Sequence, residues 1–428
     1  MRIAKAQLID PVRNQIYAIT AVTLSFFVFA YSPRFGQVSI LLFYGLWLPL
    51  VAVDYRRVIG SPRVFLPIMA FSLFAMLSVF WSAAPSVTAR ASVQFFTHVV
   101  CSLIAMRVVS NDSFVKGALL GTILVMIYSL MFGYYLFDPL DGTVSFVGAF
   151  SSKNQLGLYA SLGVYFVFAA IVILKMRRLW LIVAALTAIL SAYCLKQSES
   201  ATSVLTVIVV IGASLVLRAV RLLSPRHRIV LFIAGTVLGS LSIGAFVYSG
   251  GIDLVLGAFG KDSTLTGRTY LWQQGFAAAL QHPIIGVGYQ AYWVQGFSEA
   301  ERLWDEFYIP TRAGFHFHNT YIETAVETGI IGLFLMAGML FTALLGSLKR
   351  LLVNVNDPEA GVLFGLAMLL VERSFVEIDV LFAYQIGSFL LFFILGKLGQ
   401  RQSAVSASAP RVVRYYGSGS IQNVGNGY

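Results

Sequence analysis

The feature that most constrains the fold of this chain is a succession of apolar runs separated by short polar segments. A helix needs about 20 apolar residues to cross about 30 Å of hydrocarbon. Runs near this length occupy residues 16–30, 38–53, 64–81, 93–109, 114–137, 155–174, 179–195, 202–217, 229–248, 320–348, 360–376 and 380–396. The 428 residues are 58% hydrophobic and only 11% charged, which is too apolar for a soluble domain. The sequence therefore predicts an all-α polytopic membrane protein with about twelve transmembrane helices.

The basic residues predict how these helices are oriented. A net charge of +11 would suggest nucleic acid as the partner of a soluble protein, but here Lys and Arg gather in short clusters between apolar runs, as at 175–178 and 218–228. Cytoplasmic loops of membrane proteins carry such an excess. We therefore expect an inner-membrane protein of a bacterium with both termini in the cytoplasm. Its surroundings are membrane lipids, and no nucleic-acid partner is expected.

One long connection breaks the pattern of short loops and divides the chain. Residues 249–319 are predicted to form a periplasmic loop with short helices, between membrane helices one to nine (1–248) and ten to twelve (320–399). Within the loop we expect a turn at 250–253, a short helix over 269–280, and an aromatic segment at 286–293 that rests at the membrane interface. Residues 400–428 are rich in Ser, Ala and Gly, a composition typical of a disordered cytoplasmic tail.

The chain offers few ligands for a metal or a cofactor. Cys101 and Cys194 each lie inside an apolar run and are predicted to be packing residues. There is no Asp-x-Asp pair, and His316 and His318 lack a third ligand nearby in the sequence. We expect neither a metal nor a cofactor.

Polar side chains gather where the predicted helices reach the outer surface. Polar groups at membrane depth are costly, so a functional interpretation stands beside the structural one for each. The candidate substrate-binding residues are Lys153, Asn154, Lys196, Asn319, Glu323, Glu327, Arg373 and Glu377, and the candidate catalytic residues are His318 and Arg268. The structural interpretations are a helix cap for Asn319, a snorkelling lysine for Lys196 and a solvated loop arginine for Arg268.

The functional interpretations follow from the chemistry of each group. A guanidinium such as Arg268 can bind phosphate oxygens in a bidentate manner, and lipid diphosphates present such oxygens at the membrane surface. An imidazole such as His318 can accept a hydroxyl proton near neutral pH. Glu323 and Glu327 lie four residues apart on one helical face, where either is a candidate to orient His318. Gly329 and Gly332 then allow a neighbouring helix to approach closely.

Four motifs in order around the long loop resemble the O-antigen ligase and exopolysaccharide polymerase superfamily. They are Phe150-Ser-Ser-Lys-Asn-Gln-Leu-Gly157, Thr266-Gly-Arg-Thr-Tyr-Leu-Trp272, His282-Pro-Ile-Ile-Gly-Val-Gly288, and His318-Asn-Thr-Tyr-Ile-Glu323 with Glu327-Thr-Gly-Ile-Ile-Gly332. The resemblance implies a periplasm-facing glycosyltransferase with an all-helical, GT-C-like fold. Its donor would be a glycan on a polyprenyl diphosphate, and its acceptor a glycan or a lipid core. It also implies that His318 and Arg268 are site residues.

Details of the motifs favour the polymerase branch of this superfamily. Ligases commonly carry an arginine after the serine at the position of Ser198-Glu199-Ser200, which this chain lacks. The run 200–203, the pair Lys153-Asn154, and Glu377 after Arg373 resemble the polymerases more closely. A ligase that transfers glycan to lipid A core remains the alternative. A transporter or flippase is disfavoured, because the long loop follows the ninth run on the outer side and no internal repeat is visible. A chain-length regulator or a flippase is a possible partner.

Overall fold

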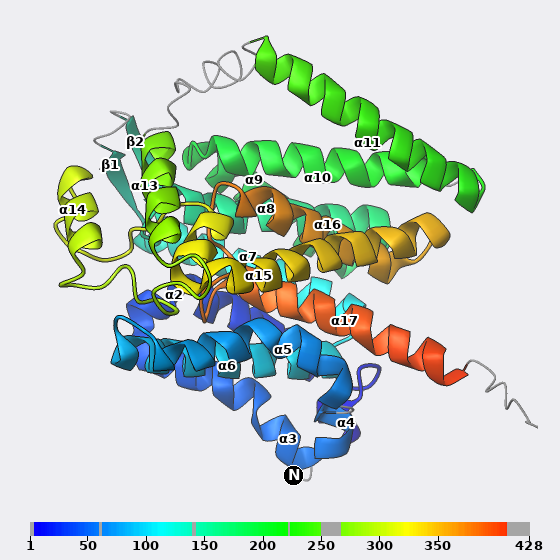
Figure 1. The fold of residues 1–428 in the computed structure, drawn as a ribbon. Helices are drawn as coiled ribbons and strands as arrows, with labels where there is room; N and C mark the ends of the chain where they lie inside the picture. Colours follow the sequence, from blue (N-terminus) through cyan, green and yellow to red (C-terminus); the bar gives the residue numbers. More distant parts are fainter. Residues whose placement is uncertain (1–3, 60–61, 139–142, 221–222, 250–266, 409–428) are drawn as a thin grey trace, which may run out of the picture.

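The computed structural model describes residues 4–59, 62–138, 143–220, 223–249 and 267–408 and consists mainly of helices that run side by side (Figure 1). The helices of the amino-terminal half are α1 (Ala6–Ile9), α2 (Gln15–Trp47), α3 (Pro49–Val53), α4 (Tyr55–Ile59), α5 (Pro62–Leu77), η1 (Ser78–Phe80), α6 (Pro85–Val108), α7 (Asn111–Phe132), α8 (Lys153–Phe168), η2 (Ala169–Ile173) and α9 (Leu179–Gln197). They are followed by α10 (Ala201–Ala219), α11 (Pro225–Tyr248), α13 (Arg268–Gln281), α14 (Ser298–Glu306), α15 (Thr320–Val353), α16 (Pro358–Ser374) and α17 (Ile386–Ser408).

The described residues confirm a multi-pass helical membrane protein. Seven of their helical segments are long and apolar enough to cross a bilayer: Gln15–Val53 (α2 together with α3), Pro85–Val108, Asn111–Phe132, Lys153–Ile173, Leu179–Gln197, Ala201–Ala219 and Thr320–Val353. The apolar segments Phe65–Phe80 and Ile386–Gln400 are shorter. The expected total of twelve spans stays a prediction, because only seven segments in the described part of the chain meet these criteria of length and hydropathy.

The segment assigned to α2 is two helices that fold back on each other. Its backbone leaves helical geometry at Tyr31 and Gly36. Beyond this break the chain returns along the first half, so that the Trp47 indole donates a hydrogen bond to Ser25 at 3.0 Å. The apolar runs 16–30 and 38–53 therefore form an antiparallel pair.

A small β-hairpin replaces the end of the fifth predicted span. The run at 114–137 was expected to be helical throughout, but α7 ends at Phe132 and the chain continues as β1 (Tyr134–Asp138), paired antiparallel with β2 (Thr143–Gly148). The fold is thus not wholly α. Gly133 permits the change of direction, because a β-carbon there would overlap the Ser129 carbonyl oxygen. The aromatic residues that follow are as compatible with a strand as with a membrane helix.

The long loop contributes two short helices at the same end of the bundle as the hairpin, with α13, α14, β1 and β2 at the left of Figure 1. The short helix expected over 269–280 is confirmed as α13, which ends at Gln281 before His282-Pro283. The expected turn at 250–253 lies outside the described residues.

The segment after α13 is inserted into a break in α15. Gly329 has φ +63°, which interrupts the helix. The backbone N–H groups of Val287 and Gly288 donate to the carbonyls of Val326 and Glu327 at 3.1 and 2.8 Å. These bonds satisfy carbonyl groups that the broken helix leaves unpaired. The close neighbour of Gly329 is therefore this loop segment, and not the helix expected from the glycine spacing.

The aromatic residues of this segment are buried in protein. Tyr289 is 0% exposed and its hydroxyl donates to the Leu381 carbonyl oxygen at 2.8 Å, and Tyr292 is 2% exposed. The Tyr289 ring packs against Phe71 of α5 and Phe95 of α6, and the Tyr292 ring packs against Phe297 and Phe317 of the loop itself. Both rings are therefore covered by protein, and the position of this segment at the membrane interface stays a prediction. Cys101 and Cys194 are buried, as predicted for packing residues.

The segments around Asn14 and Lys397 meet at the other end of the bundle. Asn14 donates to the Val108 carbonyl at 2.8 Å, and Lys397 donates to the adjacent Val109 carbonyl at 2.8 Å. Both terminal segments therefore lie on one side, and their cytoplasmic location stays a prediction. Helix α17 extends to Ser408, so the segment expected to be a tail from residue 400 begins as helix, and residues 409–428 lie outside the described part.

Candidate active site

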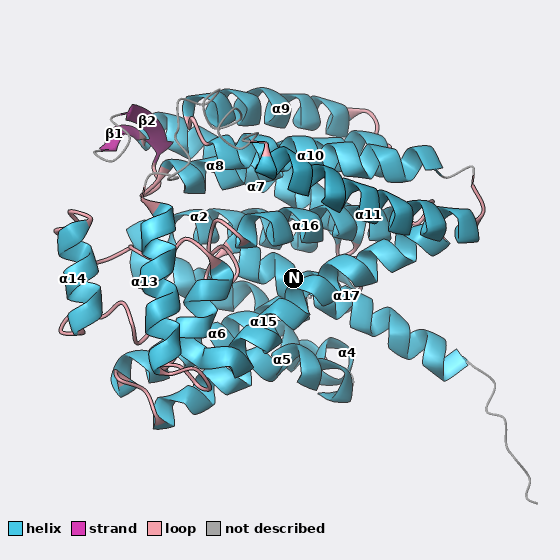
Figure 2. Ribbon diagram, turned by 45° about the horizontal axis from the view of Figure 1, so that its top comes forward, coloured by secondary structure: helices cyan, strands magenta, loops and turns pink. Residues whose placement is uncertain are grey.

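Five helices and one loop meet at the end of the bundle that carries α13 and the hairpin. Helices α8, α10, α13 and α15 begin there, α16 ends there, and residues 375–385 connect α16 to α17 (Figure 2). Hydrogen bonds and ion pairs join a cluster of side chains from these elements: Asn154, Ser200, Ser203, Arg268, His318, Asn319, Arg373, Glu377 and Asp379. We call this set the polar cluster.

Glu377 lies at the centre of the polar cluster. Its Oε1 accepts from Asn154 Nδ2 at 2.8 Å and from Arg268 Nη2 at 2.8 Å. Its Oε2 lies 3.4 Å from His318 Nδ1. One carboxylate thus connects three of the residues predicted from the sequence, although they come from α8, α13 and the segment before α15.

The charges around Glu377 stabilise its anionic form. Burial by itself raises the pKa of this carboxyl group, but the guanidinium of Arg268, the imidazole of His318 and the guanidinium of Arg373 outweigh that effect and lower the pKa to about 2. Glu377 is therefore ionised throughout the physiological range. A permanent anion at this position holds the neighbouring cation and imidazole in place.

Arg268 is the first residue of α13, one position before the start of the helix expected over 269–280. Gly267 precedes it with φ +83°, a left-handed conformation that favours glycine. The guanidinium donates to the Val376 carbonyl at 3.0 Å and to Glu377 at 2.8 Å, and the side chain remains 16% exposed. A guanidinium has five N–H donors. Among the described residues these two bonds leave donors available for an anionic ligand.

His318 is the more exposed member of the central group, at 32% of its side chain. Its Nδ1 faces Glu377, so Nε2 is the nitrogen left to face a substrate. The backbone has φ +51°, which is uncommon for a residue other than glycine and recurs at functional sites. The next residue fixes this geometry. Asn319 caps α15 through bonds to the N–H groups of Tyr321 and Ile322, as predicted, and donates to the Phe375 carbonyl at 2.8 Å.

Arg373 lies behind the polar cluster and is 1% exposed. It pairs with Asp379 and donates to Ser203 at 3.0 Å and to the Asn154 carbonyl at 3.4 Å. Burial raises the pKa of Asp379, an effect that Arg373 opposes. These contacts tie α8, α10 and α16 together. The Arg373 guanidinium is covered by protein, and its predicted role in substrate binding stays a prediction.

The two predicted lysines differ in position. Lys153 begins α8 and is half-buried next to Asn154, whose Oδ1 accepts from Ser200 at 3.0 Å. Lys196 lies in the last turn of α9 and is exposed, and none of the hydrogen bonds or ion pairs among the described residues joins it to the polar cluster. The serine-rich turn after it does take part, through Ser200 and Ser203.

No hydrogen bond or ion pair within the described part of the chain joins Glu323 or Glu327 to His318. The partner of His318 is Glu377, which corrects the expectation that one of the two α15 glutamates orients this ring. Glu323 is buried, lies 3.1 Å from His316 Nδ1, and accepts the Phe317 N–H at 2.9 Å. Glu327 is 1% exposed and faces the backbone N–H of Gln290. Glu323 thus holds the end of the loop against α15, and Glu327 faces the loop segment around Gln290.

Sequence reasoning missed part of this arrangement. Neither Asp379 nor His316 was among the candidate site residues. The pairing of Asp379 with Arg373 depends on the fold of residues 375–379, and His316 pairs with Glu323, seven residues on. Within the described residues, no group of three or more His, Cys, Asp or Glu side chains is arranged to hold a metal ion.

The fold and the polar cluster define a class: helical multi-pass membrane proteins with a group of ionisable residues at one end of the bundle. Residues 186–337 match the family model described as O-antigen ligase. The chain is 60% identical over 398 residues to the exopolysaccharide production protein ExoQ of Rhizobium meliloti (strain 1021), an alignment that covers 93% of this chain and 92% of that protein. The chain therefore belongs to the O-antigen ligase and exopolysaccharide polymerase superfamily, as its motifs indicated.

Proposed function

We propose that this protein is a membrane glycosyltransferase that polymerises polyprenyl-diphosphate-linked oligosaccharide units into exopolysaccharide, at the periplasmic face and without a metal ion. The observation that carries the proposal is the grouping of His318, Arg268 and Glu377 at one end of the bundle. The relative named as an exopolysaccharide production protein supports this product.

The proposed reaction exchanges one bond to the anomeric carbon for another. The acceptor hydroxyl oxygen bonds to the anomeric carbon of the donor sugar, and the bond from that carbon to the diphosphate oxygen breaks. The electron pair of the broken bond stays on the polyprenyl diphosphate, which departs as an anion. The hydroxyl proton must be removed in the same step. The reaction therefore needs a cationic donor near the leaving group and a base near the acceptor.

The polar cluster supplies both groups. Arg268 keeps N–H donors beyond those bound to Val376 and Glu377, and these can stabilise the developing charge on the diphosphate. His318 Nε2 can take the hydroxyl proton, because Nδ1 faces the Glu377 carboxylate, which stabilises the imidazolium that forms. Asn154 orients the same carboxylate from α8. Lys153, at the start of α8, is placed to assist with the anionic substrate.

The second candidate function is that of a ligase which transfers glycan from polyprenyl diphosphate to lipid A core. It is favoured by the family description that matches residues 186–337. Both reactions use the same donor and differ in the acceptor, so the same cluster would serve either.

A deletion strain, complemented with variants, separates these possibilities. We expect loss of secreted high-molecular-weight polysaccharide, with O-antigen on lipid A intact, and no restoration by His318→Ala or Arg268→Ala. The control variants are His227→Ala, at the other end of the bundle, and Arg312→Ala, in an exposed ion pair with Glu301. Loss of O-antigen attachment with normal secreted polysaccharide would select the ligase. Unchanged glycans with both site variants, at normal protein levels, would refute the site.

The proposed orientation has its own test. Ser298, at the start of α14, and Ser224, before α11, are both exposed and lie at opposite ends of the bundle (Figure 1). The native thiols Cys101 and Cys194 are buried. Ser298→Cys should react with a membrane-impermeant maleimide in intact spheroplasts, and Ser224→Cys only after permeabilisation. The reverse pattern would place the polar cluster on the cytoplasmic side.

A further inference from the structure

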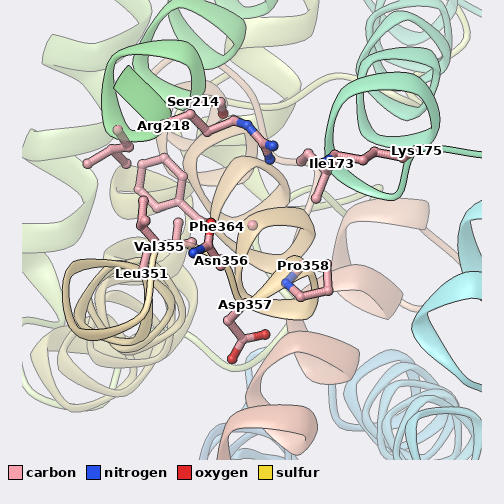
Figure 3. A pocket seen from close by; sticks show the side chains of 12 residues that line it. Ile173, Lys175, Ser214, Arg218, Leu351, Val355, Asn356, Asp357, Pro358 and Phe364 are labelled. Atoms are coloured by element: carbon pink, nitrogen blue, oxygen red, sulfur yellow. The ribbon is translucent and has the colours of Figure 1, made fainter. Parts of the chain in front are cut away.

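A cavity of about 350 Å³ lies between η2, α10, α15 and α16 (Figure 3). It is lined by the first residues of α16, whose other end reaches the polar cluster, so the cavity lies at the opposite end of the bundle. Its charged and polar lining includes Lys175, Arg218 and Asn356, and its apolar lining includes Ile173, Leu217 and Phe364. None of these residues takes part in the proposed glycosyl transfer. The cavity therefore needs an explanation of its own.

The charge of the cavity is basic. None of the ion pairs between described residues includes Arg218 or Lys175, and the nearby carboxylates of Asp357 and Glu359 pair with Arg350. Asp357 also lines the cavity, but its carboxylate accepts from Arg350 at 2.9 Å and caps α16 at the N–H of Ala360. The acidic group is thus already neutralised by a neighbouring cation, and the two basic groups are not.

The backbone around the cavity presents these cations. In η2 the N–H of Leu174 donates to the Ala169 carbonyl at 2.8 Å, the wide turn of a π-helix, which often marks functional positions. Lys175 follows with φ +53° and is exposed. In Figure 3 the guanidinium of Arg218 projects across the cavity toward Ile173, above the ring of Phe364. The positive charge of Arg218 therefore lies beside the apolar side chains of Ile173 and Phe364.

The surface beside the cavity is apolar and faces outward. Leu215 and Val216, on α10 just before Arg218, are 48% and 62% exposed. Exposed aliphatic side chains on a membrane helix are expected to contact lipid chains. A molecule bound by Arg218 can therefore extend an acyl chain along this surface, which a free anion cannot do.

We infer that this cavity binds an anionic phospholipid, with its phosphate held by Arg218 and Lys175 and an acyl chain against the apolar side chains of α10. Guanidinium groups form strong charge-assisted bonds to phosphate, and basic pockets between membrane helices are suited to such headgroups. Asn356, whose side chain lines the cavity, can donate to a headgroup oxygen. This inference does not depend on the proposed reaction.

Native mass spectrometry of the purified full-length chain tests it. Short-chain phosphatidylglycerol is the probe, with phosphatidylcholine of the same chains and inorganic phosphate as comparisons. We expect one phosphatidylglycerol retained per chain, bound roughly tenfold more weakly by Arg218→Gln or Lys175→Gln. Phosphatidylcholine should not compete, and inorganic phosphate should not displace the lipid at equal concentration.

Arg177→Gln is the matched control, since Arg177 is an exposed cation of the same loop outside the cavity lining. It should retain the lipid as the unsubstituted chain does. Equal weakening by all three variants would overturn the inference in favour of diffuse surface attraction. Displacement by inorganic phosphate would overturn the lipid assignment. Size-exclusion profiles that match the unsubstituted chain establish that each variant is folded.

Discussion

The carboxylate of Glu377 lies 2.8 Å from the guanidinium of Arg268, although 109 residues separate the two in the sequence. Both side chains are largely covered, at 8% and 16% exposure. A partly buried pair of this kind is costly to break, because removal of one member leaves the other without a partner. The proposed site therefore depends on Glu377 as much as on the two residues that would contact substrate.

Glu377→Gln should reduce polymer synthesis roughly 10- to 100-fold, the equivalent of a lost hydrogen bond to a charged group. The amide keeps the shape of the side chain but removes the charge that holds Arg268 and His318. Polysaccharide yield per unit of membrane protein is the measurement. Glu306→Gln, in the exposed pair with Arg302, is the control and should leave the yield unchanged. Equal effects of the two substitutions would refute a special role for Glu377.

The lowered pKa of Glu377, about 2, predicts how stability depends on pH. A carboxyl group whose pKa is depressed by folding contributes stability that is fully present above its unfolded pKa, near 4.5, and is lost as pH falls toward the folded pKa. The midpoint of thermal unfolding should thus be higher for the unsubstituted protein than for Glu377→Gln, by a difference that is constant from pH 7 to about pH 5. This difference between the midpoints should become smaller below about pH 4.5. A difference that grows as the pH falls would contradict a stabilising ion pair between Glu377 and Arg268.

Arg268→Lys should retain part of the activity that Arg268→Ala removes. An ammonium group keeps the positive charge, but it lacks the planar fork that reaches the Val376 carbonyl and Glu377 together. We expect synthesis below that of the unsubstituted protein by about tenfold, with a weaker apparent affinity for the lipid-linked donor. Full activity of Arg268→Lys would show that a positive charge at this position is sufficient for synthesis, which would contradict a need for the guanidinium group.

The metal-independent reaction can be tested with washed membranes. Treatment with EDTA followed by removal of the chelator complex should leave incorporation of the lipid-linked donor unchanged. Added Mg²⁺ or Mn²⁺ should not raise it. A loss that a divalent cation restores would overturn this part of the proposal.

The local features of the site could be predicted from the sequence, and its long-range pairings could not. Asn319 was recognised as a helix cap and Arg268 as a residue at a helix start, because both depend on neighbours within a few positions. The partner of His318 was sought in Glu323 and Glu327, the acids close to it in sequence. Its actual partner, Glu377, is 59 residues away and is brought there by the packing of α15 against α16. One sequence alone does not indicate that these two distant positions lie close together in the fold.

The fold shows the same division between local and long-range information. Apolar runs located the helices, since the length needed to cross a bilayer is a local property. They did not reveal the hairpin at 134–148, because Tyr134-Tyr135-Leu136-Phe137 satisfies a membrane helix and a strand equally. Gly329 was interpreted as a contact with a neighbouring helix, and no local pattern indicated that residues 283–288 would occupy the break.

Gly329 provides the sharpest test of that inserted loop. Its φ of +63° disfavours any residue with a β-carbon, and such a carbon would overlap the backbone of Ile284. Gly329→Ala should therefore lower the midpoint of thermal unfolding and disturb the pairing that positions residues 282–288. Gly338→Ala, on the same helix, is the control: its β-carbon meets no atom within 4 Å, so it should be neutral or stabilising by about 0.5–1 kcal/mol. If both variants unfold alike, the break in α15 is not needed to hold the loop.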